Sequence, residues 1–300
     1  MTPPQTPGDH GGSGALGDAG SFADDARRYQ LESRIATGGM GEVWRARDTT
    51  LGRTVAVKVL KREYADDPAF RSRFETEARH AASLHHPGIA AVFDFGEAES
   101  VDGSGVPRPY LVMELVEGEP LSALLRPGAP MDPDAATDLM AQAADAIAAA
   151  HAAGIVHRDL SPDNIILRGG APERATIIDF GIAKDTATGA RTIVGTNFAG
   201  KYEYAAPEQL EGHADFRTDL YALGASLLAV ARREVPDVGT NPGAVVRFKR
   251  DALDTSGIGA PLRDLIDWLT APDPADRPAT ASAALERLDS WLKPDSHPTS

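Results

Sequence analysis

HRDLSPDN at residues 157–164 and DFG at residues 179–181 are the two stretches from which the fold and chemistry of this chain are best inferred. Transfer of a γ-phosphoryl group needs a carboxylate that accepts the proton of the nucleophile, together with oxygen ligands that hold Mg²⁺ on the nucleotide. Asp159 suits the first role, and Asn164 and Asp179 suit the second. The two motifs therefore predict metal-dependent phosphoryl transfer.

The composition indicates a globular protein that does not bind nucleic acid. The 300 residues include 30 basic and 44 acidic side chains, for a net charge of −14, and no basic stripe stands out. The lack of cysteine excludes a disulfide framework and fits a reducing cytoplasm. The first 20 residues lack the basic start and apolar core of a signal peptide, and the longest apolar run, residues 221–231, is too short to cross a bilayer. We therefore expect a cytoplasmic protein without membrane insertion.

The first part of the chain is predicted to be a disordered tail followed by short strands. Residues 1–25 are rich in Gly, Pro, Asp and Ser and cannot bury enough apolar surface to become ordered. One helix is expected among the strands, beginning at Asp67-Pro68 and running to Leu84. Alternating and β-branched segments predict strands around residues 43–46, 55–58 and 91–93, with a hairpin loop at 103–105.

After residues 111–114 the pattern changes to helix. Asp132-Pro133 opens an Ala-rich helix that Gly154 ends. We therefore expect an α+β fold in which a small β-rich part with one helix is joined to a larger α-helical part. Further helices are predicted at residues 218–232, 261–269 and 279–292.

Three features of the β-rich part suit a nucleotide site. ATGGMGEV at residues 36–43 lies between two predicted strands, where glycines let backbone N–H groups approach phosphates, although an ordinary hairpin would explain it equally well alone. Lys58 ends an apolar strand, where a buried ammonium group needs an anionic partner, although a surface lysine is also common there. Glu77 shares a helix face with Phe70 and Phe74 and can turn inward to that lysine, whereas the competing Glu75 lies off this face.

These motifs and APE at residues 206–208 occur in one order, and in this order the chain resembles the eukaryotic-like (Hanks-type) protein kinases. The wording of the glycine loop, of LHHP at residues 84–87 and of PEQ at residues 207–209 is most similar to the bacterial serine/threonine branch. The resemblance implies ATP and Mg²⁺ as cofactors, with Mn²⁺ as a possible substitute, protein substrates with Ser or Thr hydroxyls, and a role in bacterial signalling. A dimer is possible by analogy alone.

The resemblance also implies a bilobal kinase fold with the ATP cleft between the lobes. The kinase domain would span residues 26–293, and a short tail would follow at residues 294–300. Within that domain the N-lobe would cover residues 29–113, the hinge 114–118 and the C-lobe 119–293.

The resemblance assigns roles to individual residues. Lys58, oriented by Glu77, would hold the α- and β-phosphates; Asp159 would accept the hydroxyl proton, and Asn164 and Asp179 would ligate Mg²⁺. The residues expected to bind the nucleotide are Ile35, Gly38, Gly39, Gly41, Val43, Ala56, Lys58, Met113, Glu114, Val116 and Ile166.

The same resemblance implies a phosphorylated activation loop. Arg158 beside the catalytic aspartate is typical of kinases in which a loop phosphate pairs with this arginine. Thr192 and Thr196 are nearest the expected position, and Thr186 and Thr188 are further candidates.

Three residues are expected to have structural roles. Glu208 should pair with Arg277 to fix the end of this segment, and Asp219 should anchor the catalytic loop from the helix that follows.

Two positions depart from the family pattern. The serine/threonine branch normally has a lysine two residues after the catalytic aspartate, where this chain has Ser161, and a threonine where this chain has Lys201. Because the two positions face each other across the catalytic aspartate in the family fold, a hydroxyl and an ammonium group would have exchanged places. Our hypothesis is that Lys201 supplies the positive charge to the γ-phosphate and Ser161 the hydroxyl to Asp159; a solvated Lys201 in a slow enzyme is the alternative.

The leading prediction is an ATP- and Mg²⁺-dependent protein serine/threonine kinase that autophosphorylates its activation loop. A pseudokinase that binds nucleotide and acts as a scaffold is the first alternative, and Ser161 is the only strong feature in its favour. A small-molecule phosphotransferase is the second, but APE with a partner arginine forms a platform that docks peptides.

Overall fold

The computed structural model divides the chain into two compact units, and each is treated by itself. Unit 1 comprises Met1–Asp67 and Phe95–Val112, and unit 2 comprises Pro68–Asp94 and Met113–Ser300. The residues that the structure describes are 21–24, 26–38, 41–98, 107–126, 131–169, 174–180, 201–239 and 242–292.

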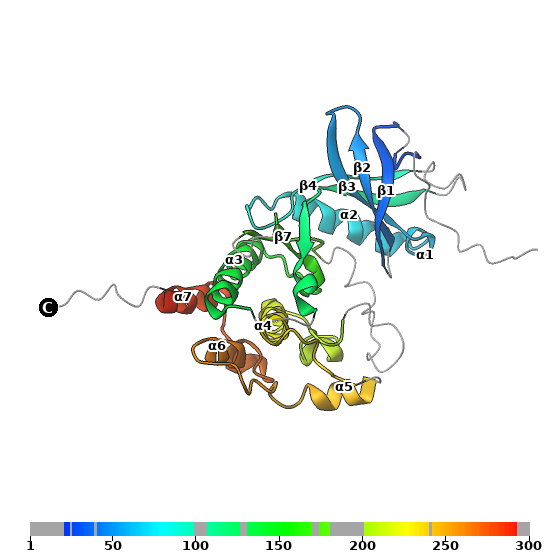
Figure 1. The fold of residues 1–300 in the computed structure, drawn as a ribbon. Coiled ribbons are helices and arrows are strands. Elements are labelled where there is room, and N and C mark those ends of the chain that lie inside the picture. The colour runs from blue at the N-terminus through cyan, green and yellow to red at the C-terminus, as the bar shows by residue number, and fades with distance from the viewer. Residues whose placement is uncertain are drawn as a thin grey trace, which may run out of the picture. The chain divides into compact units, whose positions relative to one another are not determined.

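Unit 1 is built on a five-stranded sheet in the order β1-β2-β3-β5-β4, whose first three strands stand side by side in Figure 1. β1, β2 and β3 pair antiparallel in sequence order. One face of the sheet buries alternating residues such as Val55, Val57 and Val59 with Trp44, as expected for β-branched strands with one apolar face. The strands are β1 (Tyr29–Thr37), β2 (Gly41–Asp48), β3 (Arg53–Leu60), β4 (Val92–Ala98) and β5 (Arg108–Met113), and a short helix α1 (Arg62–Ala65) follows β3.

Unit 2 is organised around α4 (Phe216–Arg232), which contacts α3, α6 and α7 (Figure 1). Residues 218–231 of α4 are all buried, so this helix is apolar on every side and forms the centre of the core. The other helices are α2 (Pro68–Ala82), α3 (Pro133–Ala152), α5 (Pro242–Phe248), α6 (Leu262–Leu269) and α7 (Ala281–Leu292).

A small second sheet in unit 2 carries the segment that leads to the candidate site. Its strand order is β6-β7-β8, and all pairs are antiparallel. The strands are β6 (Gly118–Pro120), β7 (Ile165–Arg168) and β8 (Ala175–Ile177), and the 3₁₀ helices are η1 (Leu121–Leu125), η2 (Pro162–Asn164), η5 (Glu208–Glu211) and η6 (Pro274–Asp276).

Local sequence signals explain where the long helices begin and end. Asp132 caps α3 by accepting from the Asp134 N–H at 2.8 Å, and Gly154 adopts a positive φ of 76° after the last turn. Asp215 and Thr218 form a reciprocal capping box at the start of α4.

The observed elements differ from the expected ones in four places. Residues 21–24, expected to belong to the disordered tail, pack within unit 1: Ala23 is fully buried in its core, and Asp24 accepts from the Tyr29 N–H at 2.8 Å. The helix that opens at Pro68 is grouped with unit 2 rather than with the β-rich part, and the chain after it enters the core of unit 2 through Leu84 and Ile89. The short helix α1 is an addition to the single helix expected in the β-rich part. α5 was not expected, because a seven-residue helix in which Val245 is the buried apolar residue is too short to show an apolar repeat.

No helix among the described residues is both long enough and apolar enough to cross a membrane. The expected hairpin loop at residues 103–105 lies outside the described part of the chain.

Candidate functional site

Asp219 of α4 binds the backbone of the loop at residues 157–164, which is called the catalytic loop below. The Asp219 carboxylate is fully buried and accepts from the N–H groups of His157 at 2.7 Å and Arg158 at 2.8 Å. The Nε2 atom of His151, at the end of α3, lies 2.9 Å from the same carboxylate. Arg158 has a positive φ of 62°, a strained value for a residue with a side chain, and the Asp219 contacts hold it there. The helix core thus fixes the conformation of the residue just before Asp159.

His157 connects the catalytic loop with the DFG segment. Its ring is fully buried; Nδ1 accepts from the Asp159 N–H at 3.2 Å, and Nε2 lies 3.0 Å from the carbonyl of Ile178. Because Nδ1 accepts here, the ring donates through Nε2. The ring also packs on Phe180, with centroids 4.7 Å apart. One side chain therefore contacts both motifs.

Asn164 lies against Asp159 and beside the residue that precedes Asp179. Its Nδ2 donates to the Asp159 carbonyl at 2.7 Å and lies 3.5 Å from the Asp159 carboxylate, and its own carbonyl accepts from Ile178 N–H at 2.9 Å. The amide N–H group is thus used within the loop, which leaves Oδ1 as an acceptor. Asp179 follows with a positive φ of 55°.

This donor set fits a magnesium ion held mainly by its nucleotide. Mg²⁺ in such sites takes one or two protein oxygen ligands together with phosphate oxygens and water. The Oδ1 atom of Asn164, which accepts no hydrogen bond from a described residue, and the carboxylate of Asp179 are ligands of this kind. In the described part of the chain, no group of three or more His, Cys, Asp or Glu side chains could hold a metal by itself.

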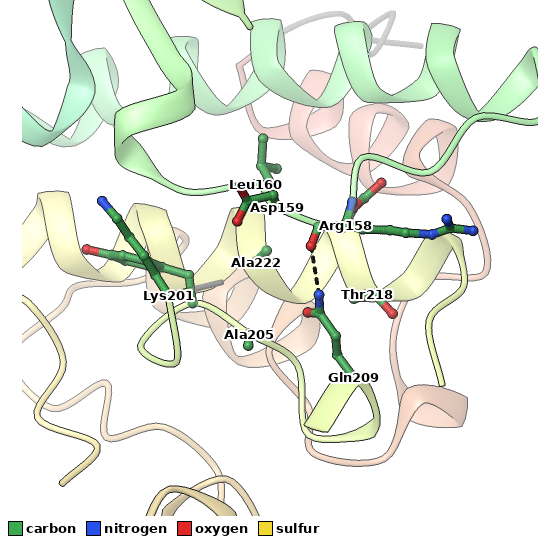
Figure 2. A pocket seen from close by; sticks show the side chains of 10 residues that line it. Arg158, Asp159, Leu160, Lys201, Ala205, Gln209, Thr218 and Ala222 are labelled. Carbon is green, nitrogen blue, oxygen red and sulfur yellow. Dashed lines mark hydrogen bonds between the residues drawn. The ribbon is translucent and has the colours of Figure 1, made fainter. Parts of the chain in front are cut away.

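Lys201 lies beside the catalytic loop, where its Nζ atom forms an ion pair with Asp163 of η2. Lys201 and Asp159 line the same small pocket (Figure 2). Desolvation lowers the pKa of Lys201, and the nearby carboxylates of Asp159 and Glu203 oppose this shift. The side chain is about half exposed. Asp163 is a partner that the sequence hypothesis did not include, and Ser161 is buried with 3% of its surface exposed.

The segment that carries Lys201 is joined to the catalytic loop through Gln209. The Gln209 Nε2 atom donates to the Arg158 carbonyl at 2.7 Å (Figure 2). Since the N–H of Arg158 is bonded to Asp219, both backbone polar groups of this strained residue have partners. Residues 201–212 therefore help to fix the catalytic loop.

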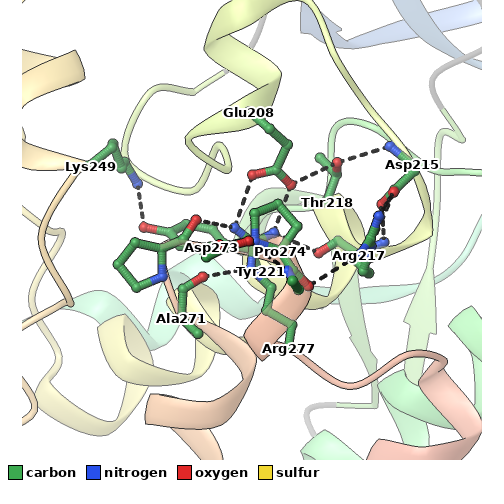
Figure 3. A network of polar contacts seen from close by, with 12 residues as sticks. Glu208, Asp215, Arg217, Thr218, Tyr221, Lys249, Ala271, Asp273, Pro274 and Arg277 are labelled. Atoms are coloured by element: carbon green, nitrogen blue, oxygen red, sulfur yellow. Dashed lines mark hydrogen bonds and ion pairs between the residues drawn. The ribbon is translucent and has the colours of Figure 1, made fainter.

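Glu208 and Arg277, which the sequence predicts to pair, form a bidentate ion pair with distances of 2.6 and 2.9 Å (Figure 3). The Arg277 side chain is fully buried and also donates to three backbone carbonyls. Thr218 of α4 donates to Glu208 at 3.2 Å. These contacts tie the end of the APE motif to α4 and to the chain before α7.

Lys249, which follows α5, also binds the segment at residues 201–212 that carries Lys201. Its Nζ donates to the Glu203 carbonyl at 2.8 Å. The same atom lies 3.4 Å from the hydroxyl of Tyr221 (Figure 3). Lys249 and Arg277 each lie 4.9 Å from the centroid of the Tyr221 ring. Desolvation lowers the pKa of Lys249 to about 7; the Glu203 carboxylate opposes this shift and Arg277 adds to it.

Several residues expected to bind the nucleotide lie on the strands of unit 1. Lys58 and Val43 are register partners on β3 and β2, Ala56 is buried, and Ile35 is 52% exposed on β1. The strand register therefore sets the relative positions of these residues, all of which are expected to bind the nucleotide.

Gly41 has a clear structural reason to be glycine. A Cβ atom there would lie 2.2 Å from the carbonyl oxygen of Val59, which is closer than atoms can approach. Gly38 N–H donates to the Gly41 carbonyl at 2.8 Å and so closes the loop. The predicted residue Gly39 lies outside the described part of the chain.

The other residues expected to bind the nucleotide belong to unit 2. Met113 and Ile166 are buried, and the N–H of Glu114 is bonded to the Ala91 carbonyl at 2.8 Å. The Glu114 carboxylate accepts from Arg168 at 2.7 Å and from the Ala91 N–H at 3.3 Å. Val116 is half-buried between β5 and β6.

Glu77 and Glu75 occupy different faces of α2. Glu75 accepts from Arg79 at 2.5 Å in an exposed i,i+4 pair. Glu77 is half-buried between the buried Phe74 and Ala78, and its Oε2 atom is buried. Glu77 is therefore the inward-facing carboxylate of the helix.

Some expected residues are not described, and some contacts were not foreseen. The four activation-loop candidates Thr186, Thr188, Thr192 and Thr196 lie outside the described residues. His151, Gln209 and Lys249 are partners of the site that sequence reasoning missed. Their types are common on helix surfaces, so only their partners, distant in the sequence, distinguish them.

Comparison with known proteins agrees with this geometry. The profile of the family described as "Protein kinase domain" matches residues 29–288. Serine/threonine-protein kinase PknA of Mycobacterium tuberculosis is 49% identical over 199 residues, which cover 66% of this chain and 45% of PknA. Serine/threonine-protein kinase PknB of Mycobacterium leprae is 38% identical over 278 residues, which cover 89% of this chain and 44% of PknB. This chain thus spans less than half the length of these relatives.

Solved structures give the same result. The crystal structure of the Mycobacterium tuberculosis PknI kinase domain matches with a TM-score of 0.65 and 25% identity, over 91% of this chain and 98% of that one. The crystal structure of Rad53 1-466 in complex with AMP-PNP matches with a TM-score of 0.70 and 26% identity, over 87% of this chain and 64% of that one. The chain therefore has the protein kinase fold and belongs to the protein kinase family.

Proposed function

We propose that this protein transfers the γ-phosphoryl group of ATP, with Mg²⁺, to Ser or Thr hydroxyls of protein substrates. The observation that carries the proposal is the conformation of the catalytic loop, in which Asp159 lies against Asn164 on a backbone bound to the buried Asp219. The names of the PknA and PknB relatives support the serine/threonine class, and the Rad53 complex with AMP-PNP supports an adenine nucleotide.

In this proposal Asp159 accepts the proton of the substrate hydroxyl as that oxygen attacks the phosphorus atom. Asn164 and Asp179 would hold Mg²⁺, or Mn²⁺ in its place. The bound metal would neutralise charge on the phosphates during transfer. Lys58, oriented by Glu77, would hold the α- and β-phosphates.

Lys201 supplies the positive charge that the family normally takes from a lysine at position 161. Its proximity to Asp159 in a shared pocket supports this role. Lys201 is paired with Asp163, and the γ-phosphate would compete with that carboxylate for it. Loss of a charge of this kind costs about 3–4 kcal/mol at the transition state, on the order of a hundredfold to a thousandfold in rate.

Autophosphorylation with labelled ATP and Mg²⁺ tests the proposed activity. We expect label in the wild type, on Thr192 or Thr196, and none in Asp159→Asn. Asp138→Asn is a matched control, because it removes a carboxylate from the exposed face of α3. Nucleotide binding without label in the wild type would instead favour a pseudokinase that acts as a binding module.

A double-mutant cycle tests the exchanged residues. Ser161→Lys and Lys201→Thr should each lower the rate of transfer, whereas the double variant, which restores the family pattern, should recover most of it. Asp163→Asn frees Lys201 from its partner and should not reduce the rate. Additive losses in the double variant would refute the exchange of roles between Ser161 and Lys201. They would not contradict the proposal that the protein is a kinase.

A further inference from the structure

A second cavity in unit 2, apart from the candidate site, has an apolar wall. It has a volume of about 330 Å³ and lies between the end of α4, residues 234–237 and residues 251–254. The helix α5, which lies between these two segments in the sequence, is labelled in Figure 1. Leu228 and Leu253 form its buried floor, while Val235 and Phe248 remain 46% and 36% exposed. A volume of this size accommodates one large apolar side chain of a partner.

The rim of the cavity is acidic. Glu234, Asp237, Asp251 and Asp254 all line it, together with a single cation, Arg232. Arg232 is already bound, because its guanidinium donates to a backbone carbonyl at 2.7 Å and lies 3.5 Å from Asp254. Within the described residues, no ion pair involves the other three carboxylates. The rim therefore presents unbalanced negative charge around an apolar centre.

We propose that this cavity docks a basic segment of a partner protein, which inserts one large apolar side chain and places Lys or Arg residues against the rim. Desolvated apolar anchors at the centre of a polar rim carry most of the affinity in protein interfaces, and opposite charge improves encounter and specificity. The inference concerns binding alone and does not depend on the proposed phosphoryl transfer.

Charge argues against the two nearest alternative occupants. A second copy of this chain would bring a net charge of −14 to an acidic rim. The first 20 residues of the chain contain no Lys or Arg and therefore cannot pair with the carboxylates.

Two adjacent residues link the cavity wall to the candidate site. Phe248 of the cavity wall precedes Lys249, whose Nζ donates to the Glu203 carbonyl, two residues from Lys201. A partner seated here would thus contact the same turn that holds the Lys201 segment in place.

Fluorescence anisotropy with a labelled peptide tests the inference on the full chain. The probe is a ten-residue peptide with one phenylalanine flanked by two arginines on each side. We expect a Kd on the order of 10–100 µM at low salt, weakened at least about tenfold when serine replaces the phenylalanine. Failure to saturate up to about 1 mM would overturn the proposal.

Variants locate the binding to the cavity. Glu234→Gln with Asp251→Asn removes two rim charges whose carboxylates form no hydrogen bond or ion pair with any described residue, and should weaken binding roughly three- to tenfold. The control, Asp138→Asn with Asp264→Asn, removes the same charge from other exposed positions of unit 2 and should leave Kd unchanged. Equal peptide affinity of the two double variants would refute the role of the rim carboxylates in binding.

Ala252→Trp fills the cavity from an exposed position and should abolish peptide binding. Sedimentation velocity on the same variant distinguishes the occupant. A wild-type dimer that Ala252→Trp dissociates would overturn the assignment to a foreign partner in favour of a second copy.

Discussion

Replacing Glu208 with glutamine should destabilise unit 2 by about 3 kcal/mol, because it leaves the guanidinium charge of Arg277 buried without its counter-charge. The Arg277 side chain has no exposed surface, and its remaining N–H groups are bound to backbone carbonyls at 2.7, 3.1 and 3.0 Å. The side chain therefore has no route to water. The figure is at the low end of the 3–5 kcal/mol typical for such losses, because glutamine still accepts one hydrogen bond.

Urea unfolding of Glu208→Gln, Arg277→Met and the double variant measures this loss. The double variant should be less destabilised than the sum of the single variants, since it removes both charges together. Glu75→Gln is the matched control: it breaks an ion pair with Arg79 whose side chains are 47% and 62% exposed, and should cost less than about 1 kcal/mol. A Glu208→Gln variant as stable as this control would refute the argument that burial makes the pair strong.

Three further outcomes follow from the contacts. Asp219→Asn should cost about 1–3 kcal/mol, because its amide N–H faces a backbone donor of the catalytic loop, and hydrogen exchange should accelerate in that loop. Burial lowers the pKa of Lys249 from 10.5 in the unfolded chain to about 7 in the folded protein, so the unfolded chain holds more protons between pH 7 and pH 10.5. The free energy of unfolding of the wild type relative to Lys249→Met should therefore rise over this pH range in urea titrations. Gly41→Ala should cost about 1–3 kcal/mol through its clash with Val59, whereas Gly259→Ala, which meets nothing within 4 Å, should not lower the melting temperature.

The sequence predicted the long elements because their signals are local. α3 begins at Pro133, directly after its cap Asp132, and ends before Gly154, and α6 and α7 start within two residues of their predicted positions. Caps and apolar periodicity depend on residues within one or two helical turns, so the local sequence is enough to predict them. α5 escaped because a seven-residue helix shows no repeat.

The contacts of the candidate site depend on partners that are far apart in the sequence. His151 and Gln209 are bound to residues 68 and 51 positions away, and nothing in their own neighbourhoods marks them. Lys201 shows the same limit, since sequence reasoning placed it toward Asp159 and the phosphate but did not foresee Asp163 as its partner. A family motif assigns a residue to a site, whereas the local ion pairs depend on the side chains present in this chain.

The pairing of Glu208 with Arg277 bears on how this protein is made. The two residues are 69 positions apart, and the ribosome adds about 5–20 residues per second, so Glu208 waits roughly 3–14 s for its partner. For most of that interval α6 has not been synthesised, and α7 follows only after Arg277, so the buried surface of α4 lacks both of its covering helices. The nascent chain is therefore exposed to aggregation and to chaperones until α6 and α7 have emerged. Slow codons between these two positions would lengthen that exposure, although they leave the finished protein unchanged.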